Sequence, residues 1–139
     1  MMAGIKGRDT KPELMIRRGL HALGFRYRLH VSSLPGKPDI VLRKYRAVIL
    51  VNGCFWHRHE CHLFKWPSTR REFWHEKLER NVEVDRRSIS ALRDTGWRVL
   101  VIWECALKGR TRLALDEVVR RTSNWLLSDS AWEEISGGR

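Results

Sequence analysis

The amino-acid sequence predicts a single α/β domain in which a mixed central β-sheet is flanked by helices. Three observations indicate this class: an amphipathic helical pattern near the start, several short apolar runs typical of strands, and a long helical pattern between two of those runs. A chain of 139 residues, of which 42% are hydrophobic, is long enough to bury one core. The sequence contains no internal repeat, linker or low-complexity segment, so we expect one domain over residues 1–139.

The first helix is predicted to begin after Thr10 and to end at Gly24. Thr10 is a typical N-terminal cap, a proline follows in the first turn, and Glu13 stands three residues after the cap, as in a capping box. Gly24 is a typical helix stop. Positions 13, 16, 20 and 23 share one face and read Glu, Ile, Leu and Leu, so Glu13 extends an apolar stripe. Spacing alone favours the capping role for Glu13.

Short strands are expected between residues 25 and 51. The segment FRYRLHV alternates between apolar and polar residues and is typical of a half-exposed strand. The segment SSLPGKPD has the composition of a turn. The segment IVLRKYRAVILV contains two apolar runs around a short polar turn, which indicates a β-hairpin. Asp39 therefore precedes the first strand of the hairpin.

A long helix is predicted to begin with a second capping box, Thr69 to Glu72, and to end at Gly96. Its apolar face would consist of Phe73, Leu78, Val82, Ile89 and Leu92. Trp74 would then point away from the core. Residues 97–103, WRVLVIW, are nearly all apolar, as expected of a strand covered on both faces. A last helix is expected over roughly residues 112–127, and a loose tail over residues 128–139.

The net charge of +11 at pH 7 is concentrated in the first third of the chain. Residues 1–46 contain eleven Lys or Arg and three Asp or Glu, whereas residues 47–69, 70–96 and 97–139 each carry a surplus of one positive charge. This excess is larger than a solvated surface needs for solubility, so we expect a nucleic acid as partner. The sequence has no membrane-spanning run and no signal-peptide core at its start, which favours a cytoplasmic location.

Residues 54–62 combine two cysteines with three histidines, which indicates a metal site. The candidate ligands are Cys54, His59, Cys61 and Cys105. Thiolate and imidazole are the donors that Zn²⁺ prefers, and four of them make a structural site that would pin the loop to a distant strand end. His57 and His62 compete with His59 for the nitrogen position, and spacing does not choose between them. The simpler interpretation, three unrelated buried thiols, does not explain the clustering.

Asp39 and His57 are the candidate residues for hydrolytic chemistry. Mg²⁺ prefers carboxylate and carbonyl oxygens, so Asp39 and a main-chain oxygen of the neighbouring strand could hold it against a phosphate. The simpler interpretation is that Asp39 caps a turn. If His59 binds zinc, His57 is free to accept a proton from water, and the alternative is a surface histidine.

Three aromatic residues, Phe55, Trp56 and Trp74, are candidates for contact with nucleic-acid bases. Two of them lie inside the metal loop, where a packed core is hard to reach. Exposed large rings on a basic protein suggest stacking on bases or insertion between them. Ordinary packing is the alternative, and it is the interpretation preferred for Trp97, Trp103 and Trp125.

Taken together, these residues resemble the very-short-patch repair (Vsr) endonucleases. The matching segments are RDTKPE, LPGKPDIV, VNGCFWHRHEC, EFWHEKLERNVEVDRR and GWRVLVIWECALKGR, which cover most of residues 8–110 in order. The resemblance implies a fold similar to that of the PD-(D/E)xK nucleases. It also implies strand-specific nicking 5′ to the thymine of a T:G mismatch, the lesion left when 5-methylcytosine is deaminated.

The resemblance assigns a role to each candidate residue. Asp39 and the main-chain carbonyl of Val51 would hold Mg²⁺. Glu13 would support the water shell of the metal, which replaces its capping role, and His57 would activate the attacking water. Zn²⁺ would be held by Cys54, His59, Cys61 and Cys105. The residues that enter the duplex beside the mismatch would be Phe55, Trp56 and Trp74.

Two positions depart from the pattern of the family. Asn52 stands where better-known members carry a second active-site histidine, so proton handling or mismatch preference is expected to differ. The N-terminal arm, residues 1–9, is shorter than in typical members, which predicts weaker or altered DNA contact.

The expected partner is double-stranded DNA that contains a mismatch, with mismatch-repair proteins as further candidates and the protein acting as a monomer at the bacterial nucleoid. Two alternatives stay open. One is a nicking or restriction endonuclease of the same fold with another target. The other is a zinc-stabilised DNA-binding module without catalysis.

Overall fold

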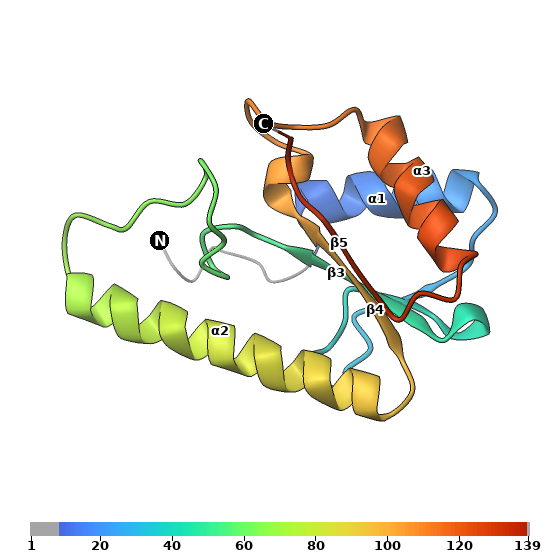
Figure 1. Cartoon of the computed structure of the whole chain (residues 1–139), viewed down its shortest axis with the longest axis horizontal. Helices are drawn as coiled ribbons and strands as arrows, with labels where there is room; N and C mark the ends of the chain where they lie inside the picture. The colour runs from blue at the N-terminus through green and yellow to red at the C-terminus, as the bar shows by residue number, and fades with distance from the viewer. Residues whose placement is uncertain (1–8, 139) are drawn as a thin grey trace.

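The computed structural model describes residues 9–138, which fold into one mixed α/β domain, as predicted (Figure 1). The helices and strands are α1 (Lys11–Ala22), β1 (Arg28–Leu29), β2 (Ile40–Leu42), β3 (Ala47–Asn52), α2 (Arg71–Asp94), β4 (Arg98–Trp103), α3 (Leu115–Leu126) and β5 (Trp132–Ile135). Except for Asp9, the predicted N-terminal arm lies outside the described residues. Within residues 9–138, no helix combines the length and apolar character needed to span a bilayer.

The strands form one sheet in the order β1-β2-β3-β4-β5. The pairs β1/β2 and β2/β3 are antiparallel, whereas β3/β4 and β4/β5 are parallel, so the sheet is mixed. The predicted hairpin is confirmed: β2 and β3 flank a 3-10 turn, Arg43–Tyr45, which Arg46 closes with a φ of 50°. The strand predicted over residues 25–31 is shorter than expected, because only two of its residues pair with β2.

Helices cover both faces of the sheet (Figure 1). One face packs against α1 and α3 in a core that contains Ile49 and Leu100. The opposite face packs against the second half of α2, with Val48, Val101 and Leu92 in its core. Adjacent residues of β3 and β4 enter different cores because side chains alternate across a strand. The strand β4 is therefore buried on both faces, as its composition predicted.

The capping box predicted at the start of α1 is present with one difference. The Thr10 side chain accepts a hydrogen bond from the N–H of Glu13 at 3.4 Å. The Glu13 carboxylate, however, accepts from the N–H of Asp9 at 3.0 Å, one residue earlier than expected. Leu23 was predicted on the buried face, but it is 57% exposed because α1 ends at Ala22.

The start of α2 differs from its prediction. The residue that precedes the helix is Arg70, with a φ of 52° and no capping side-chain hydrogen bond, so the box expected at Thr69 does not form. The first half of α2 projects past the end of β3 (Figure 1). Phe73 consequently has no core to enter and is 42% exposed, whereas the prediction buried it. Trp74 is half-buried among the aromatic rings of the loop that precedes α2.

The C-terminal segment is not the loose tail that was predicted. Residues 132–135 form β5 beside β4, and Ile135 is fully buried. The N–H of Gly137 then donates to Cys105 Sγ at 3.3 Å, and the N–H of Gly138 donates to the Thr111 carbonyl at 2.8 Å. Residues 132–138 therefore belong to the sheet and to the segment that follows β4.

Candidate functional site

Four of the predicted site residues line one cleft at the carboxyl end of β3. They are Asp39, Val51, Asn52 and His57, and the cleft has a volume of about 880 Å³. The hairpin brings them together, because antiparallel pairing places the start of β2 beside the end of β3. The loop that leaves β3 adds His57, and α2 forms the opposite wall with Val84, Asp85 and Ser88.

Asp39 is tied to β3 by a hydrogen bond. Its Oδ2 accepts from the main-chain N–H of Val51 at 2.7 Å. Because the N–H and C=O of a strand residue point toward the same edge, the Val51 carbonyl also lies on the Asp39 side of β3. Burial raises the pKa of Asp39 to about 7, and this hydrogen bond acts in the opposite direction. A bound cation would remove the cost of that buried charge.

Glu13 lies beside this cleft and is 1% exposed. Its Oε2 is 3.1 Å from Arg17 Nη1 and 3.1 Å from His30 Nε2. The ligand atoms of Asp9, Glu13 and His30 all lie within 4.8 Å of one another. The buried carboxylate is thus held by two nitrogen-bearing side chains, as a buried charge requires.

His57 is paired with an acid that the sequence prediction missed. Its Nδ1 forms a close hydrogen bond with Asp85 Oδ2. An acceptor on Nδ1 fixes the orientation of an imidazole and leaves Nε2 as the nitrogen available to another group. One turn earlier on α2, Asn81 donates to the Trp56 carbonyl at 3.0 Å and helps to hold the loop. No sequence signal singles out Asp85, because it is one of six acids in residues 71–94.

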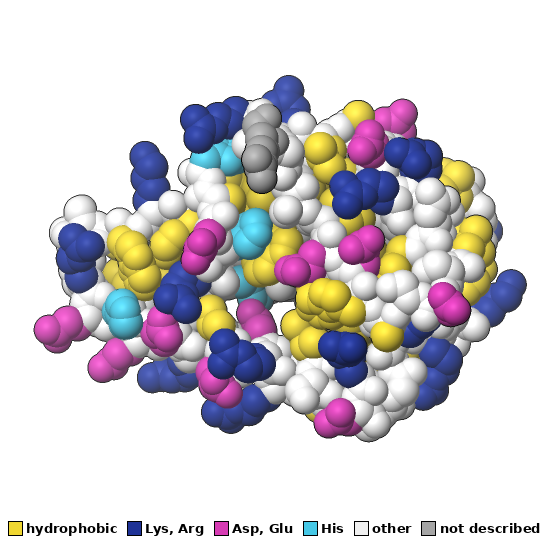
Figure 2. Space-filling view, viewed as in Figure 1, with side chains coloured by type: hydrophobic (Ala, Val, Ile, Leu, Met, Phe, Trp, Pro, Cys, Tyr) yellow, Lys and Arg dark blue, Asp and Glu magenta, His cyan; other side chains and the backbone are white. Residues whose placement is uncertain are grey.

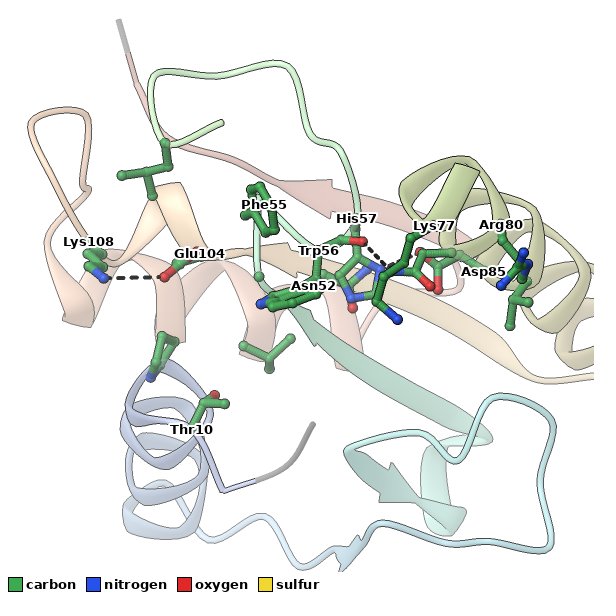
Figure 3. A pocket seen from close by; sticks show the side chains of 16 residues that line it. Thr10, Asn52, Phe55, Trp56, His57, Lys77, Arg80, Asp85, Glu104 and Lys108 are labelled. Atoms are coloured by element: carbon green, nitrogen blue, oxygen red, sulfur yellow. Dashed lines mark hydrogen bonds and ion pairs between the residues drawn. The ribbon is translucent and has the colours of Figure 1, made fainter. Parts of the chain in front are cut away.

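Asn52 lies buried at the end of β3, where three hollows meet. All three hollows also include His57 and Asp85 in their walls. Figure 3 shows Asn52, Trp56 and His57 between Thr10, which caps the start of α1, and α2. Asn52 therefore lines the candidate site, to which it offers an amide group.

The predicted aromatic residues form one cluster. The ring centroids of Phe55 and Trp56 are 5.0 Å apart, those of Phe55 and Trp74 5.5 Å, and those of Trp56 and Trp74 5.9 Å. Phe64 extends the cluster and stacks on Phe55 at 6.0 Å. All four rings are only half-buried, so the cluster presents apolar faces to solvent.

The cations near this aromatic cluster come from outside the basic first third of the chain. The groove that contains Phe55 and Trp56 is lined by Lys77, Arg80 and Lys108 (Figure 3). The first-third cations Arg43 and Arg46 instead flank the hairpin turn, at the opposite end of β3. Figure 2 shows Lys and Arg side chains spread around one face of the molecule, with acids between them. Among residues 9–138, the basic charge of the first third is thus divided between the hairpin turn and the cleft, where Lys37 lines the wall.

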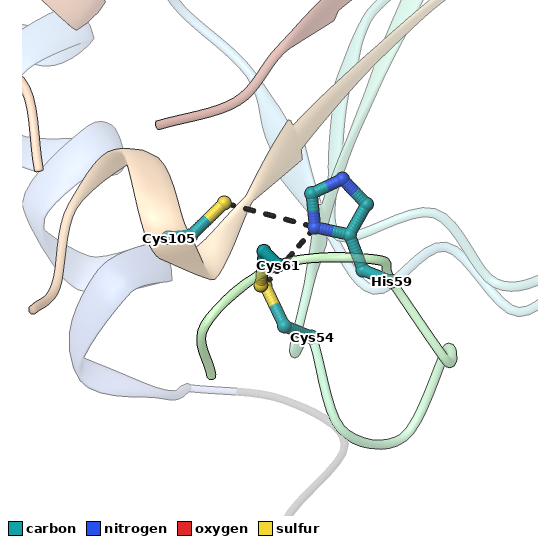
Figure 4. A group of neighbouring side chains, drawn as sticks. All are labelled: Cys54, His59, Cys61 and Cys105. Carbon is teal, nitrogen blue, oxygen red and sulfur yellow. Dashed lines mark hydrogen bonds between the residues drawn. The ribbon is translucent and has the colours of Figure 1, made fainter. Parts of the chain in front are cut away.

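The four predicted ligands of the metal site meet in one cluster, Cys54, His59, Cys61 and Cys105 (Figure 4). Their ligand atoms all lie within 4.8 Å of one another. His59 Nδ1 is 3.4 Å from Cys54 Sγ and 3.7 Å from Cys105 Sγ. Bonds of tetrahedral zinc to sulfur and nitrogen place neighbouring ligands about 3.6 Å apart, so this donor set fits such an ion.

The structure also separates the three competing histidines. Only His59 joins the cysteine cluster among the described residues, and its ring stacks on Trp103 at 4.0 Å. His57 is engaged by Asp85, and His62 lies 3.3 Å from Thr111 Oγ1. Burial lowers the pKa of His59, which favours the neutral imidazole that a metal requires.

A buried carboxyl group and an imidazole–carboxylate pair in one cleft, beside clustered aromatic rings and cations, are the features expected of an enzyme that cleaves nucleic acid. The family model described as DNA mismatch endonuclease Vsr matches residues 1–63. A DNA mismatch endonuclease Vsr from Escherichia coli is 48% identical over 134 residues, which cover 96% of this chain and 86% of that protein.

Type II nicking enzymes are also similar to the chain. One from Xanthomonas oryzae pv. oryzae, V.XorIIP, is 43% identical over 84% of this chain and 90% of its own length. Another from Neisseria meningitidis, V.NmeAIP, is 41% identical over 86% of this chain and 87% of its own length. The chain belongs to the Vsr family of DNA mismatch endonucleases.

Proposed function

We propose that this protein nicks one strand of duplex DNA 5′ to the thymine of a T:G mismatch. The observation that carries the proposal is that Asp39 and His57 line the same cleft, in direct continuity with the aromatic cluster. The names of the relatives, a mismatch endonuclease and several nicking enzymes, support the same substrate class.

The proposed catalytic ion is Mg²⁺. The Asp39 carboxylate and the Val51 carbonyl are hard oxygen donors on one strand edge, and such donors suit Mg²⁺. The bound ion would supply positive charge that stabilises the phosphate in the transition state. Glu13, buried beside these donors, would orient water in the cleft.

His57 is the proposed general base. Its free nitrogen would accept a proton from water while the water oxygen bonds to phosphorus and the phosphorus bond to the leaving oxygen breaks. Asp85 would hold the ring in the tautomer that presents this nitrogen to the water. Asn52 would contribute a hydrogen-bonding amide to the same cleft.

Phe55, Trp56 and Trp74 are proposed to enter the duplex beside the mismatch. Insertion of rings costs unstacking energy, and a mismatched pair is easier to unstack than a matched one. The rings would therefore convert weak pairing into selectivity. Lys77 and Arg80, which line the same groove, would contact the backbone phosphates.

Zn²⁺ is the proposed occupant of the Cys/His cluster, with a structural role. Four protein ligands fill a tetrahedral ion and leave no position for substrate. The ion would fix the loop that carries Phe55, Trp56 and His57.

We further propose that the fold is similar to that of the PD-(D/E)xK nucleases. We also propose that the protein acts as a monomer on cytoplasmic DNA.

The test is a nicking assay on labelled duplexes in which each strand is followed separately. We expect a nick in the thymine strand of a T:G duplex with Mg²⁺ and none with EDTA. A matched T:A duplex of the same sequence, and duplexes with the other mismatches, serve as controls.

The same assay separates the rivals. Cleavage of a matched site, or of another mismatch in preference to T:G, would show a nicking enzyme with a different target, the alternative that the type II relatives favour. Equal binding in EDTA and Mg²⁺ with no cleavage of any duplex would leave a DNA-binding module and overturn the proposal.

A further inference from the structure

The cleft contains a second imidazole, His30, which follows β1 directly. Its side chain is 14% exposed and faces carboxylates with both ring nitrogens. Nε2 lies 3.1 Å from Glu13 Oε2 and 3.3 Å from Asp9 Oδ1. Nδ1 lies 3.9 Å from Asp39 Oδ1. One ring therefore spans the space between Asp39, proposed to hold the catalytic ion, and Glu13, proposed to orient water beside it.

The backbone of His30 is fixed to the same place. Its N–H donates to the Asp39 carbonyl at 3.1 Å, so the two residues are held together by main chain as well as by side chain. The φ of His30 is 50°, a left-handed conformation that residues other than glycine rarely adopt. Such a conformation persists only where the surrounding structure enforces it, and it is common at functional sites.

Glu13 and Asp39 need a group between them. The charge of Glu13 is one of the causes that raise the pKa of Asp39, and His30 acts in the opposite direction. Arg17 contacts Glu13 and Asp9, but its ion pairs do not extend to Asp39. Among residues 9–138, His30 is the side chain that pairs with both Glu13 and Asp39.

We propose that His30 is a positioning residue that bridges Glu13 and Asp39 and sets the spacing of the two carboxylates for the catalytic divalent cation. The inference rests on the proposed function of this cleft. Of the two imidazoles that line the cleft, His57 is engaged by Asp85 and so is not available for this task. Asn52, at the end of β3, carries a single amide group. It lacks the two ring nitrogens with which an imidazole can face two acids at once.

The experiment compares His30→Gln and His30→Ala with the unchanged protein, using the full chain with its zinc loaded. Mn²⁺ is the probe, because free Mn²⁺ is counted directly by electron paramagnetic resonance. Loss of a side chain that orients metal ligands raises the metal Kd by about 10–100-fold. We expect a shift of this size for His30→Ala and a smaller one for His30→Gln, whose amide reaches one acid at a time.

A second measurement separates positioning from mere folding. The Mn²⁺ concentration for half-maximal nicking should rise in both variants, while the nicking rate at saturating Mn²⁺ stays near that of the unchanged protein. His21→Gln is the matched control, because His21 is exposed on α1 and lies outside the cleft. Thermal unfolding and zinc content report whether each variant is folded. If His30→Ala does not fold, the result is decided by His30→Gln.

The outcomes are distinct for the two proposals. Unchanged Mn²⁺ binding and an unchanged Mn²⁺ requirement in a folded His30 variant overturn the role of His30, while the nicking of mismatched DNA stands. Weakened Mn²⁺ binding in the variants, with no cleavage of any mismatched duplex by the unchanged protein, supports the role of His30 and overturns the proposed function.

Discussion

The Asp39 carboxylate lies 2.7 Å from the main-chain nitrogen of Val51, across the open end of the β2/β3 hairpin. The pairing of β2 with β3 begins at Ile40 and Ile49, so the next positions outward are Asp39 and Leu50, and Val51 lies one residue beyond on β3. The geometry of a hairpin thus fixes an acid and a peptide group at one edge, without help from any loop.

Replacement of Asp39 by asparagine should abolish nicking. The amide keeps the shape of the side chain but removes the charge that would bind the ion, and loss of metal assistance corresponds to a rate decrease of about 10³-fold or more. DNA binding should stay within roughly threefold, because the aromatic cluster and its cations are untouched. Rates and gel-shift affinities are compared with those of Asp94→Asn, an exposed acid at the end of α2. Nicking by Asp39→Asn at the normal rate would refute the metal assignment.

The stability of the protein without Mg²⁺ at Asp39 should fall as the pH rises from about 4 to 7. The pKa of Asp39 is about 7 in the folded state against 3.8 for the ordinary group, so the folded chain keeps a proton that the unfolded chain has released. The contribution of Asp39 to the free energy of unfolding is therefore largest below pH 4. It decreases between pH 4 and 7, by at most on the order of 4 kcal/mol. Urea unfolding of the zinc-loaded protein in buffer without Mg²⁺, at several pH values, measures the slope. Asp39→Asn should remove this slope, and an identical slope in the variant would contradict the assignment.

Replacement of Asp85 by asparagine should lower the nicking rate without loss of fold. The amide can turn either its oxygen or its NH2 group toward His57 Nδ1, so the ring is no longer held in one tautomer. A general base contributes about 10²–10⁴-fold to rate, and we expect a loss of at least about 10²-fold. Single-turnover rates are measured beside Glu83→Gln, which removes a surface acid from the same helix. A rate equal to that of the control would exclude a role for the pair.

Removal of one cysteine from the metal cluster should unfold the loop and release the ion. Burial raises the pKa of the Cys54 and Cys105 thiols, so without metal they stay protonated, and metal binding must displace protons. Cys54→Ser should contain substoichiometric zinc by elemental analysis, melt at lower temperature and lose activity. His62→Gln should retain one zinc per chain, because His62 contacts Thr111 instead. Full zinc content in Cys54→Ser would show that the cluster does not bind it.

Replacement of the half-buried Trp74 and replacement of the exposed Phe73 should affect mismatch selectivity differently. Trp74→Ala removes a ring that contacts Phe55 and Trp56, so the ratio of T:G nicking to binding of matched DNA should fall by about tenfold or more. Phe73→Ala is the matched control, since Phe73 is exposed beside Arg70 and its ring contacts Trp74 rather than Phe55 or Trp56. Equal losses for the two variants would indicate that the helix end is merely destabilised.

Much of the fold could be predicted because hydropathy patterns reflect which faces are buried. The α1 helix, the hairpin and the doubly covered β4 all follow from such patterns. Prediction from hydropathy fails where a segment's burial does not follow its apolar pattern. Phe73 fits a helical stripe but lies beyond the sheet, and the β5 sequence WEEI has two acids in a strand that is buried mainly through Ile135.

The candidate site was predicted less completely for a related reason. Asp39, His57 and the metal ligands carry distinctive neighbours in sequence, so spacing and family resemblance found them. Asp85 and His30 are ordinary residues in their segments. Asp85 matters through His57, 28 residues away, and His30 through Glu13 and Asp39, 17 and 9 residues away. Such contacts arise only when α1, α2, β2 and β3 are assembled.

The Cys105 sulfur receives the N–H of Gly137, although three of its companions in the cluster precede it by more than forty residues. Until residues 105 and 137 have both been synthesised, the loop therefore lacks its last candidate ligand and the main-chain group that holds that ligand. The cluster can assemble only after β4 and β5 have been made, although the loop that it fixes precedes them both.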